Sequence, residues 1–244
     1  MSAMDIPSPR RHFPPEHIGH PPMHHHPARL AWRDNGTPVS TKFDDPYFSL
    51  ENGLAETRHV FLAGNGLPER LRAGFHVAEL GFGTGLNLLA LWAAAREAGV
   101  AVRYTGFEAF PMTAEEAGRA LAPFAGAFPD LVETLVVQWP EAGGRMSAEG
   151  LEAEVITGDA RACLPGWDGL ADAWFLDGFS PAKNPELWEP ELMAEVARHT
   201  APGGTFATYT AAGHVRRALE AAGFAVTRQP GFGRKRHMST GTLA

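Results

Sequence analysis

The chain has 244 residues, of which 44% are hydrophobic and 20% charged, with a formal net charge of -7 at neutral pH. This length fits one large domain or two small ones, and it allows a core that needs no disulfide or structural metal. The single cysteine, Cys163, excludes an intrachain disulfide and any zinc site built from several cysteines. Because no apolar run approaches about 18 residues and no secretory apolar region stands at the start, we expect a cytoplasmic protein without a membrane helix.

The first 28 residues differ in composition from the rest. They hold seven prolines and six histidines and show no apolar periodicity, which predicts a disordered leader over residues 1–28. Histidines 24 to 26 can bind stray metal ions, but nothing around them would fix ligands in a defined geometry. We therefore expect no metal site.

Basic residues gather toward the C-terminus. From Arg198 to Ala244 there are seven basic residues and one acid, Glu220, so this segment carries +6 and the remaining chain -13. A local basic surface on an acidic body is compatible with a nucleic-acid substrate held at one edge. Chance asymmetry on a solvated face is the alternative interpretation.

Strand and helix patterns alternate along the chain from Leu30 onward. Asp34-Asn35-Gly36 predicts a hairpin turn, and residues 51–62 predict a helix that ends at a Gly-Asn-Gly sequence. Strands are predicted over residues 75–80, 102–107, 154–157, 173–176, 205–209, 224–228 and 236–242, and helices over 86–98, 113–122, 130–138, 161–164, 191–199 and 211–222. This alternation predicts an α/β fold with a mostly parallel sheet covered on both faces, formed by residues 73–244, with an N-terminal addition over 29–72.

A glycine-rich turn follows the first strand of the predicted sheet. Gly81, Gly83 and Gly85 alternate along it, and glycine lets the backbone turn sharply and lie close to a ligand. A dinucleotide fingerprint needs its third glycine at position 86, which is leucine. The observed spacing instead favours S-adenosylmethionine, whose ammonium group Glu79 can face. A tight strand-to-helix connection without a ligand is the alternative.

Two further acids stand at predicted strand ends, where ligands bind in open parallel sheets. Glu108 ends the second strand of the sheet, and a carboxylate there accepts hydrogen bonds from ribose hydroxyls in nicotinamide enzymes as well. Asp159 follows the strand predicted over 154–157. It can accept a hydrogen bond from an adenine amino group or simply cap the helical turn at Arg161.

The loop after the strand predicted over 173–176 has the most unusual composition. It begins Asp177-Gly178-Phe179 and includes Pro181 and Lys183. Methyl transfer to an amine needs a neutral nitrogen lone pair, and a carboxylate can orient the amine and accept its proton. We therefore expect Asp177 to be the catalytic residue and Phe179, Pro181 and Lys183 to contact the substrate. An aspartate that only caps a turn is the alternative.

Several long segments closely resemble one known family. They are Glu51–Arg70, Glu79–Asn87, Trp174–Trp188, Gly203–Gly223 and Gly231–Arg236. In this order they resemble the methyltransferase part of the bifunctional tRNA 5-methylaminomethyl-2-thiouridine biosynthesis protein family, which also occurs as a stand-alone enzyme. The resemblance runs from about Arg29 to the C-terminus, and it implies the Rossmann-like class I fold of S-adenosylmethionine-dependent methyltransferases.

The resemblance implies methylation of the 5-aminomethyl group on the wobble (2-thio)uridine, in the tRNA anticodon loop. It also implies a set of residues around the cofactor: Tyr47, Asn52, Glu79, Gly81, Gly83, Gly85, Asn87, Glu108 and Asp159. Among them Tyr47 and Asn52 are expected to close the pocket. The basic C-terminal segment is expected to bring Arg234 and Lys235 to the tRNA phosphates.

The sequence departs from the family in three ways, and several rival functions stay open. The flavin-dependent oxidase half of the bifunctional form is absent, so we expect a separate FAD-dependent oxidase to supply the aminomethyl substrate. The proline- and histidine-rich leader is not a family feature. Ser180 stands where the family commonly has alanine, and His237 where it usually has an acid. The rivals are a small-molecule N-methyltransferase or an aminopropyltransferase of the same fold, and a non-catalytic subunit that docks tRNA for a separate oxidase.

Overall fold

The computed structural model describes residues 26–49, 52–141 and 143–244. The predicted disordered leader therefore lies outside the described residues, except for its last three. Of these, Ala28 donates its backbone N–H to the carbonyl oxygen of Pro111 at 3.1 Å. Within the described part of the chain, no helix is long and apolar enough to cross a membrane.

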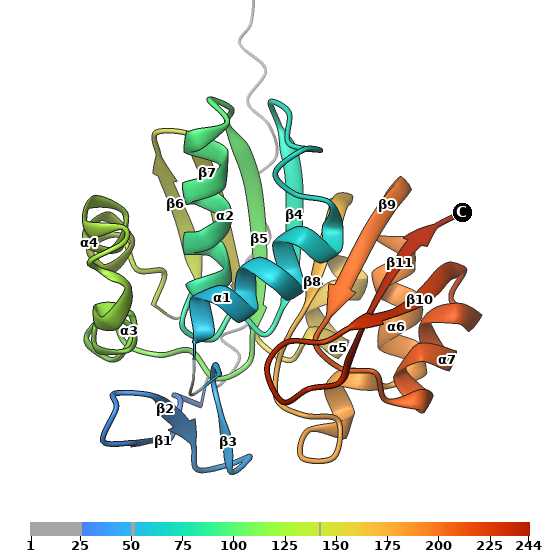
Figure 1. Ribbon diagram of the computed structural model, residues 1–244, viewed down its shortest axis with the longest axis horizontal. Helices are drawn as coiled ribbons and strands as arrows, with labels where there is room; N and C mark the ends of the chain where they lie inside the picture. The colour runs from blue at the N-terminus through green and yellow to red at the C-terminus, as the bar shows by residue number, and fades with distance from the viewer. Residues whose placement is uncertain (1–25, 50–51, 142) are drawn as a thin grey trace, which may run out of the picture.

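An eight-stranded sheet forms the body of the molecule (Figure 1). Its strands are β4 (Phe75–Leu80), β5 (Val102–Glu108), β6 (Gly144–Ala148), β7 (Leu151–Thr157), β8 (Ala171–Leu176), β9 (Thr200–Thr208), β10 (Phe224–Pro230) and β11 (His237–Leu243). They lie in the order β10-β11-β9-β8-β4-β5-β7-β6. Only β6 and β11 run against the direction of the other strands of this sheet. The predicted mostly parallel sheet is confirmed.

The strand order determines where ligands can bind. The chain proceeds from β4 outward through β5 to β7, and then returns to pair β8 with the other side of β4. Loops that leave β4 and its neighbours consequently diverge above this reversal point and leave a crevice at the carboxyl ends of the strands. All four acidic positions predicted at strand ends belong to this edge of the sheet.

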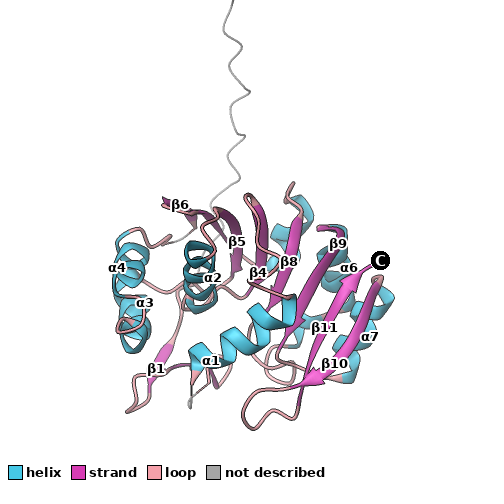
Figure 2. Cartoon of the chain, turned by 45° about the horizontal axis from the view of Figure 1, so that its top comes forward, coloured by secondary structure: helices cyan, strands magenta, loops and turns pink. Residues whose placement is uncertain are grey.

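Helices cover both faces of the sheet (Figure 2). The helices are α2 (Leu86–Glu97), α3 (Ala114–Leu121) and α4 (Pro129–Val137) on one face, and α5 (Ala160–Cys163), α6 (Pro190–Arg198) and α7 (Gly213–Ala221) on the other. Two hydrophobic clusters result, one on each face of the sheet. Their large members include Trp92 of α2 on one face and Trp174 and Trp188 on the opposite face. Burial of these faces supplies the main driving force for the fold.

The N-terminal addition consists of a small sheet and a helix. Antiparallel strands β1 (Leu30–Trp32), β2 (Pro38–Ser40) and β3 (Asp45–Pro46) form the sheet, and the predicted hairpin is thereby confirmed. Helix α1 (Gly53–Thr57) continues as a π-helix over Arg58–Leu62 and a 3-10 turn that ends at Gly66, whose φ of 67° closes the segment. This helical segment crosses the same face of the sheet as α2, close to β9 (Figure 1).

Most predicted elements agree with the structure, but strands β3 and β6 were not predicted and β9 begins earlier than expected. Strand β6 was not predicted because its sequence, Gly-Arg-Met-Ser-Ala, has one buried residue and lies at the sheet edge, where little apolar alternation is needed. Strand β9 begins at Thr200, before the predicted Pro202-Gly203-Gly204 turn. The pairing of β9 with β8 shifts its register between Ala171 and Ala173 of β8. The predicted turn residues of β9 therefore form an irregularity within that strand and do not end it.

Candidate active site

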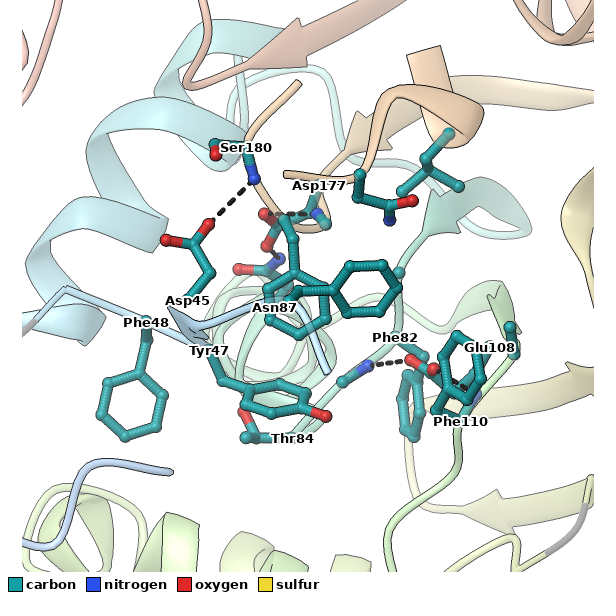
Figure 3. A pocket seen from close by; sticks show the side chains of 18 of the residues that line it. Asp45, Tyr47, Phe48, Phe82, Thr84, Asn87, Glu108, Phe110, Asp177 and Ser180 are labelled. Carbon is teal, nitrogen blue, oxygen red and sulfur yellow. Dashed lines mark hydrogen bonds between the residues drawn. The ribbon is translucent and has the colours of Figure 1, made fainter. Parts of the chain in front are cut away.

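A cavity of about 610 Å³ opens at the carboxyl ends of the central strands (Figure 3). The loops that follow β4, β5, β7 and β8 form its floor and sides. The segment around β3, the end of α1 and the side chain of Lys235 complete the wall. The cavity therefore lies at the reversal point of the sheet, where the sequence predicts the ligand, and the N-terminal addition is part of it.

The glycine-rich turn brings backbone atoms close to this cavity. Gly81 and Gly83 line it and have φ angles of 81° and 54°, a region that favours glycine. A Cβ atom on Gly81 would lie 3.0 Å from the backbone nitrogen of Gly178, and one on Gly83 would lie 3.1 Å from the ring of Tyr47. Gly85 lies outside the lining and packs against Trp139 at the start of α2.

Glu108 lies at the end of β5 with its carboxylate held by backbone donors. Gly83 donates its N–H to Oε2 at 2.8 Å, and Phe110 donates its N–H to Oε1 at 2.7 Å (Figure 3). Burial raises the pKa of this carboxyl, and the hydrogen bond from Gly83 opposes the rise. Each oxygen keeps a lone pair free, so the two oxygens can accept hydrogen bonds from a pair of neighbouring hydroxyls.

Asp159 both lines the cavity and caps helix α5. Its Oδ1 accepts a hydrogen bond from the backbone N–H of Arg161 at 2.9 Å, and its Oδ2 accepts one from the Arg161 guanidinium at 2.7 Å. These bonds to Arg161 hold the pKa of Asp159 below its ordinary value. The two interpretations of this residue, a cap and a cavity acceptor, are therefore compatible.

Glu79 lies beneath the cavity rather than in its wall. The side chain is fully buried, and Asn87 donates to its Oε1 at 2.5 Å while the Tyr104 hydroxyl donates to its Oε2. Burial, reinforced by the nearby charge of Asp177, raises the pKa of Glu79 well above its ordinary value. The expectation that Glu79 faces the ammonium group of a ligand stays a prediction: Glu79 lies outside the cavity lining, and Asn87, which donates to it, lines the cavity.

Asp177 lies in the cavity at the end of β8. Asn87 donates to its Oδ2 at 2.8 Å, and the N–H of Gly178 donates to its Oδ1 at 2.8 Å (Figure 3). Burial raises the pKa of Asp177 to about 7, while the hydrogen bonds and the charge of Lys235 oppose that rise. A carboxylate with this pKa is suited to accept a proton near neutral pH.

Aromatic side chains line the cavity beside Asp177. Phe179 stacks on Phe43 with ring centroids 4.7 Å apart, and Tyr47 meets the edge of Phe179 at 5.0 Å. The ammonium group of Lys42 lies 3.9 Å from the centroid of the Phe110 ring. Phe179 and Tyr47 are in the predicted set, whereas Phe43 and Lys42 come from the N-terminal addition, where the sequence gives no signal for them. Flat apolar rings of this kind suit a planar base.

The other predicted contact residues of the loop after β8 lie outside the cavity lining. Pro181 does not reach it, and the Lys183 ammonium pairs with Asp44 at 3.3 Å and with Asp45 at 3.5 Å. Asp45 also accepts a hydrogen bond from the N–H of Ser180 at 2.9 Å (Figure 3). Lys183 thus ties the loop to the start of β3, and its predicted contact with the substrate stays a prediction.

Asn52 also has a structural role. Its Oδ1 accepts a hydrogen bond from the N–H of Ala55 at 2.9 Å, which caps the N-terminus of α1. The side chain is exposed and does not line the cavity, and its predicted part in closing the pocket stays a prediction. Tyr47 does line it, and burial raises the pKa of its hydroxyl above the ordinary value.

Lys235 points into the cavity from the loop that joins β10 and β11. Its ammonium group lies 2.9 Å from Oε1 of Glu56 and 3.9 Å from the ring centroid of Tyr209. Tyr209 in turn donates its hydroxyl to the carbonyl oxygen of Gly178 at 2.8 Å. The predicted contact of Lys235 with a phosphate stays a prediction; in this structure Lys235 is paired with the carboxylate of Glu56, near Asp177. Arg234 lies on the exposed side of the same loop, outside the cavity lining.

Comparisons with known proteins agree with this geometry. Residues 126–244 match a family described as S-adenosyl-L-methionine-dependent methyltransferase. The chain is 49% identical over 220 residues to the tRNA 5-methylaminomethyl-2-thiouridine biosynthesis bifunctional protein MnmC of Caulobacter vibrioides, covering 86% of this chain and 37% of that protein. It is 46% identical over 236 residues to the protein of the same name from Pseudomonas aeruginosa, covering 88% of this chain and 35% of that protein. The chain thus spans little more than a third of the length of these relatives.

A solved structure gives the same result. The crystal structure of MNMC2 from Aquifex aeolicus superimposes with a TM-score of 0.71 and 26% sequence identity, covering 90% of this chain and 72% of that one. The strand order and the glycine turn at its reversal point, together with the matched family, define a class I S-adenosylmethionine-dependent methyltransferase. Within that class, the chain is similar to the methyltransferase part of the tRNA 5-methylaminomethyl-2-thiouridine biosynthesis proteins.

The residues present fit S-adenosylmethionine. Side chains at Gly81 and Gly83 would fill space beside the loop, and Glu108 offers two oxygens to ribose hydroxyls. Asp159, the residue expected to accept a hydrogen bond from an adenine amino group, lines the same cavity. When bound, this cofactor supplies an electrophilic methyl group.

Proposed function

We propose that the chain transfers a methyl group from S-adenosylmethionine to the 5-aminomethyl group of the wobble (2-thio)uridine in tRNA, giving 5-methylaminomethyl-2-thiouridine. The observation that carries the proposal is the position of Asp177, in the cavity wall beside a stacked aromatic pair and with a pKa of about 7. This arrangement can hold a planar base and an amine together. The kinship with the MnmC proteins supports the choice of substrate.

Methyl transfer to this amine requires deprotonation of the nitrogen, exchange of the bond to the methyl group, and alignment of the two reacting atoms. A primary amine is protonated in water, so its proton must first pass to a base, and the Asp177 carboxylate can accept it. The nitrogen lone pair then forms the new N–C bond as the S–CH3 bond breaks, and the sulfur keeps the electron pair. The aromatic rings of Phe43 and Phe179 hold the base so that the nitrogen is aligned with the methyl group.

The substrate's size suggests where the tRNA lies. Arg234 and Arg236 are exposed on the loop between β10 and β11, and Lys235 of that loop reaches the cavity. A phosphate near the wobble nucleotide can therefore meet these arginines while the base enters the cavity. We also propose, as parts of the same hypothesis, a cytoplasmic location and a separate FAD-dependent oxidase that supplies the aminomethyl substrate.

Reconstitution tests this function directly. The purified chain is incubated with S-adenosylmethionine and tRNA that carries 5-aminomethyl-2-thiouridine, and the nucleosides are analysed by mass spectrometry. The expected result is a gain of one methyl group on that nucleoside. In a deletion strain, 5-aminomethyl-2-thiouridine should accumulate. If the tRNA stays unmethylated while spermidine or small amines are alkylated, the same-fold alternatives replace the proposal. If the chain binds tRNA but S-adenosylmethionine does not bind, the non-catalytic docking subunit replaces it.

A further inference from the structure

Two consecutive residues at the end of α1 reach the catalytic carboxylate by separate routes. Glu56 and Thr57 are both buried and both line the cavity, although they belong to the N-terminal addition. We infer that they are positioning residues: Thr57 orients Asp177 through Asn87, and Glu56 holds Lys235 beside Asp177. This inference rests on the proposed function, in which Asp177 accepts the proton.

The first route is a chain of three hydrogen bonds. The Thr57 hydroxyl donates to Oδ1 of Asn87 at 2.8 Å. The two N–H groups of the Asn87 amide point to carboxyl oxygens, Glu79 at 2.5 Å and Asp177 at 2.8 Å, so the amide oxygen is the end that faces Thr57. All donors and acceptors of the amide are used, so the group cannot rotate without losing bonds to both carboxyls.

The second route is an ion pair. Glu56 accepts a hydrogen bond from the Lys235 ammonium at 2.9 Å, and only 10% of the Glu56 side chain is exposed. The ammonium also lies over the ring of Tyr209, 3.9 Å from its centroid, in a cation–π contact. The pair closes the loop between β10 and β11 onto α1, and His59 and Pro230 reinforce this contact with a hydrogen bond of 3.1 Å. The half-exposed Lys235 side chain is thereby held at the cavity, where its charge acts on Asp177.

The helix that carries both residues is itself unusual. The α-helical turns of α1 change at Arg58 into a π-helix that extends to Leu62. Such wide turns are rare and occur mostly at functional sites. Here the change falls directly after Thr57, so the two positioning residues occupy the last turn before it.

The charges around Asp177 give the two routes opposite effects. The carboxylate is faced by Glu56 from α1, Glu79 from β4, Lys235 from the loop after β10 and Tyr209 from the end of β9. The Asn87 hydrogen bond and Lys235 lower the pKa of Asp177, whereas the charge of Glu56 raises it. Loss of the Thr57 hydroxyl should therefore raise this pKa. In Glu56→Gln the amide oxygen can still accept the hydrogen bond from Lys235 and keep it in place, so loss of the Glu56 charge alone should lower the pKa.

The experiment compares the pH dependence of the single-turnover methylation rate for Thr57→Val and Glu56→Gln, with tRNA as acceptor. Since the active form of Asp177 is ionised, the rate falls on the acidic side of its pKa. Thr57→Val should move this acidic limb to higher pH, and Glu56→Gln should move it to lower pH, each by about 0.5 to 1 unit. Thr57→Ser should restore the original profile. The free substrate amine is the same in all variants, so a difference between two profiles reports on the groups of the chain that surround it.

Matched controls separate position from stability. Thr134→Val removes a hydroxyl that bonds to Asp130 in α4, and Glu69→Gln removes an exposed carboxylate outside the cavity lining, so both should leave the profile unchanged. Limbs that move in the same direction, or that do not move in variants with normal affinity for S-adenosylmethionine, would overturn the inference. Failure of the proposed function would differ, because the unsubstituted chain would then not methylate the tRNA at all. If Thr57→Val does not fold, the test depends on Glu56→Gln alone, whose acidic limb should move to lower pH.

Discussion

The backbone N–H of Gly83 donates to Oε2 of Glu108 at 2.8 Å, joining the turn after β4 to the end of β5. This bond requires the turn to lie flat along the cavity, and a φ of 54° at Gly83 provides that path. The position thus combines close approach to a ligand with the orientation of the carboxylate that is expected to bind the ribose.

Substitution of Gly83→Val should lower the affinity for S-adenosylmethionine at least tenfold, measured by isothermal titration calorimetry. The side chain would start 3.1 Å from Tyr47 and strain the backbone at a positive φ. Gly74→Val is the control, because Gly74 also has a positive φ of 74° but has open space around its Cβ position. Equal losses of affinity in two equally folded variants would contradict the assignment of the turn.

Asp177→Asn should slow single-turnover methylation by about 10² to 10⁴, with cofactor affinity nearly unchanged. The amide is similar in shape but cannot accept the proton of the amine. In the unsubstituted chain the rate should fall as the pH drops below about 7, the pKa of Asp177, because the carboxylate becomes protonated. Near-normal turnover by the variant at neutral pH would leave Asp177 with a structural role only.

Arg234→Ala and Lys235→Ala should affect tRNA binding differently, although the two residues are neighbours. Each phosphate contact contributes about one unit to the slope of log affinity against log salt. We expect Arg234→Ala to reduce this slope by about one and Lys235→Ala to leave it unchanged, since Lys235 is paired with Glu56. Filter binding over a salt series measures both. A reduced slope for Lys235→Ala would show that the ion pair opens when tRNA binds.

His76 should make the fold sensitive to mild acid. Its Nδ1 lies 3.0 Å from the Leu170 carbonyl oxygen and its Nε2 2.9 Å from the Thr105 hydroxyl, an arrangement that suits a neutral ring. Burial, followed by the charge of Arg103, lowers its pKa from 6.5 to about 4. Between pH 6.5 and about 4, His76 binds a proton in the unfolded chain but stays neutral in the folded chain. Its contribution to the free energy of unfolding is therefore complete above pH 6.5 and is lost as the pH falls toward 4.

The free energy of unfolding, measured with urea, should be lower at about pH 5 than at about pH 7.5, and His76 should account for roughly 2 kcal/mol of the difference. Because other groups also titrate, the relevant quantity is the difference between the unsubstituted chain and His76→Gln. His214→Gln, at an exposed position, serves as the control. An identical pH dependence in all three chains would mean that His76 is protonated as easily when folded as when unfolded.

Much of the fold and part of the site follow from local sequence patterns. Apolar strands that alternate with amphipathic helices indicate a mostly parallel sheet, and such a sheet must collect its strand ends at one edge. The residues at those ends, Gly81, Gly83, Glu108, Asp159 and Asp177, all line the cavity as predicted. Their positions depend on elements that the sequence defines within a few residues, so local reasoning is sufficient for them.

The remaining features depend on contacts between distant parts of the chain. Lys235 and Glu56 are 179 residues apart, and Asn87 and Asp177 are 90 apart, so no local pattern can pair them. Glu79 reads as a ligand-facing acid in the sequence, yet Asn87 covers it, because α2 begins directly over the end of β4. The sequence by itself determined the class of fold and the edge of the sheet that holds the site. Only the packing of α1 and the loop between β10 and β11 onto that edge decided which charges surround Asp177, because the free energy that places them comes from burial shared among distant segments.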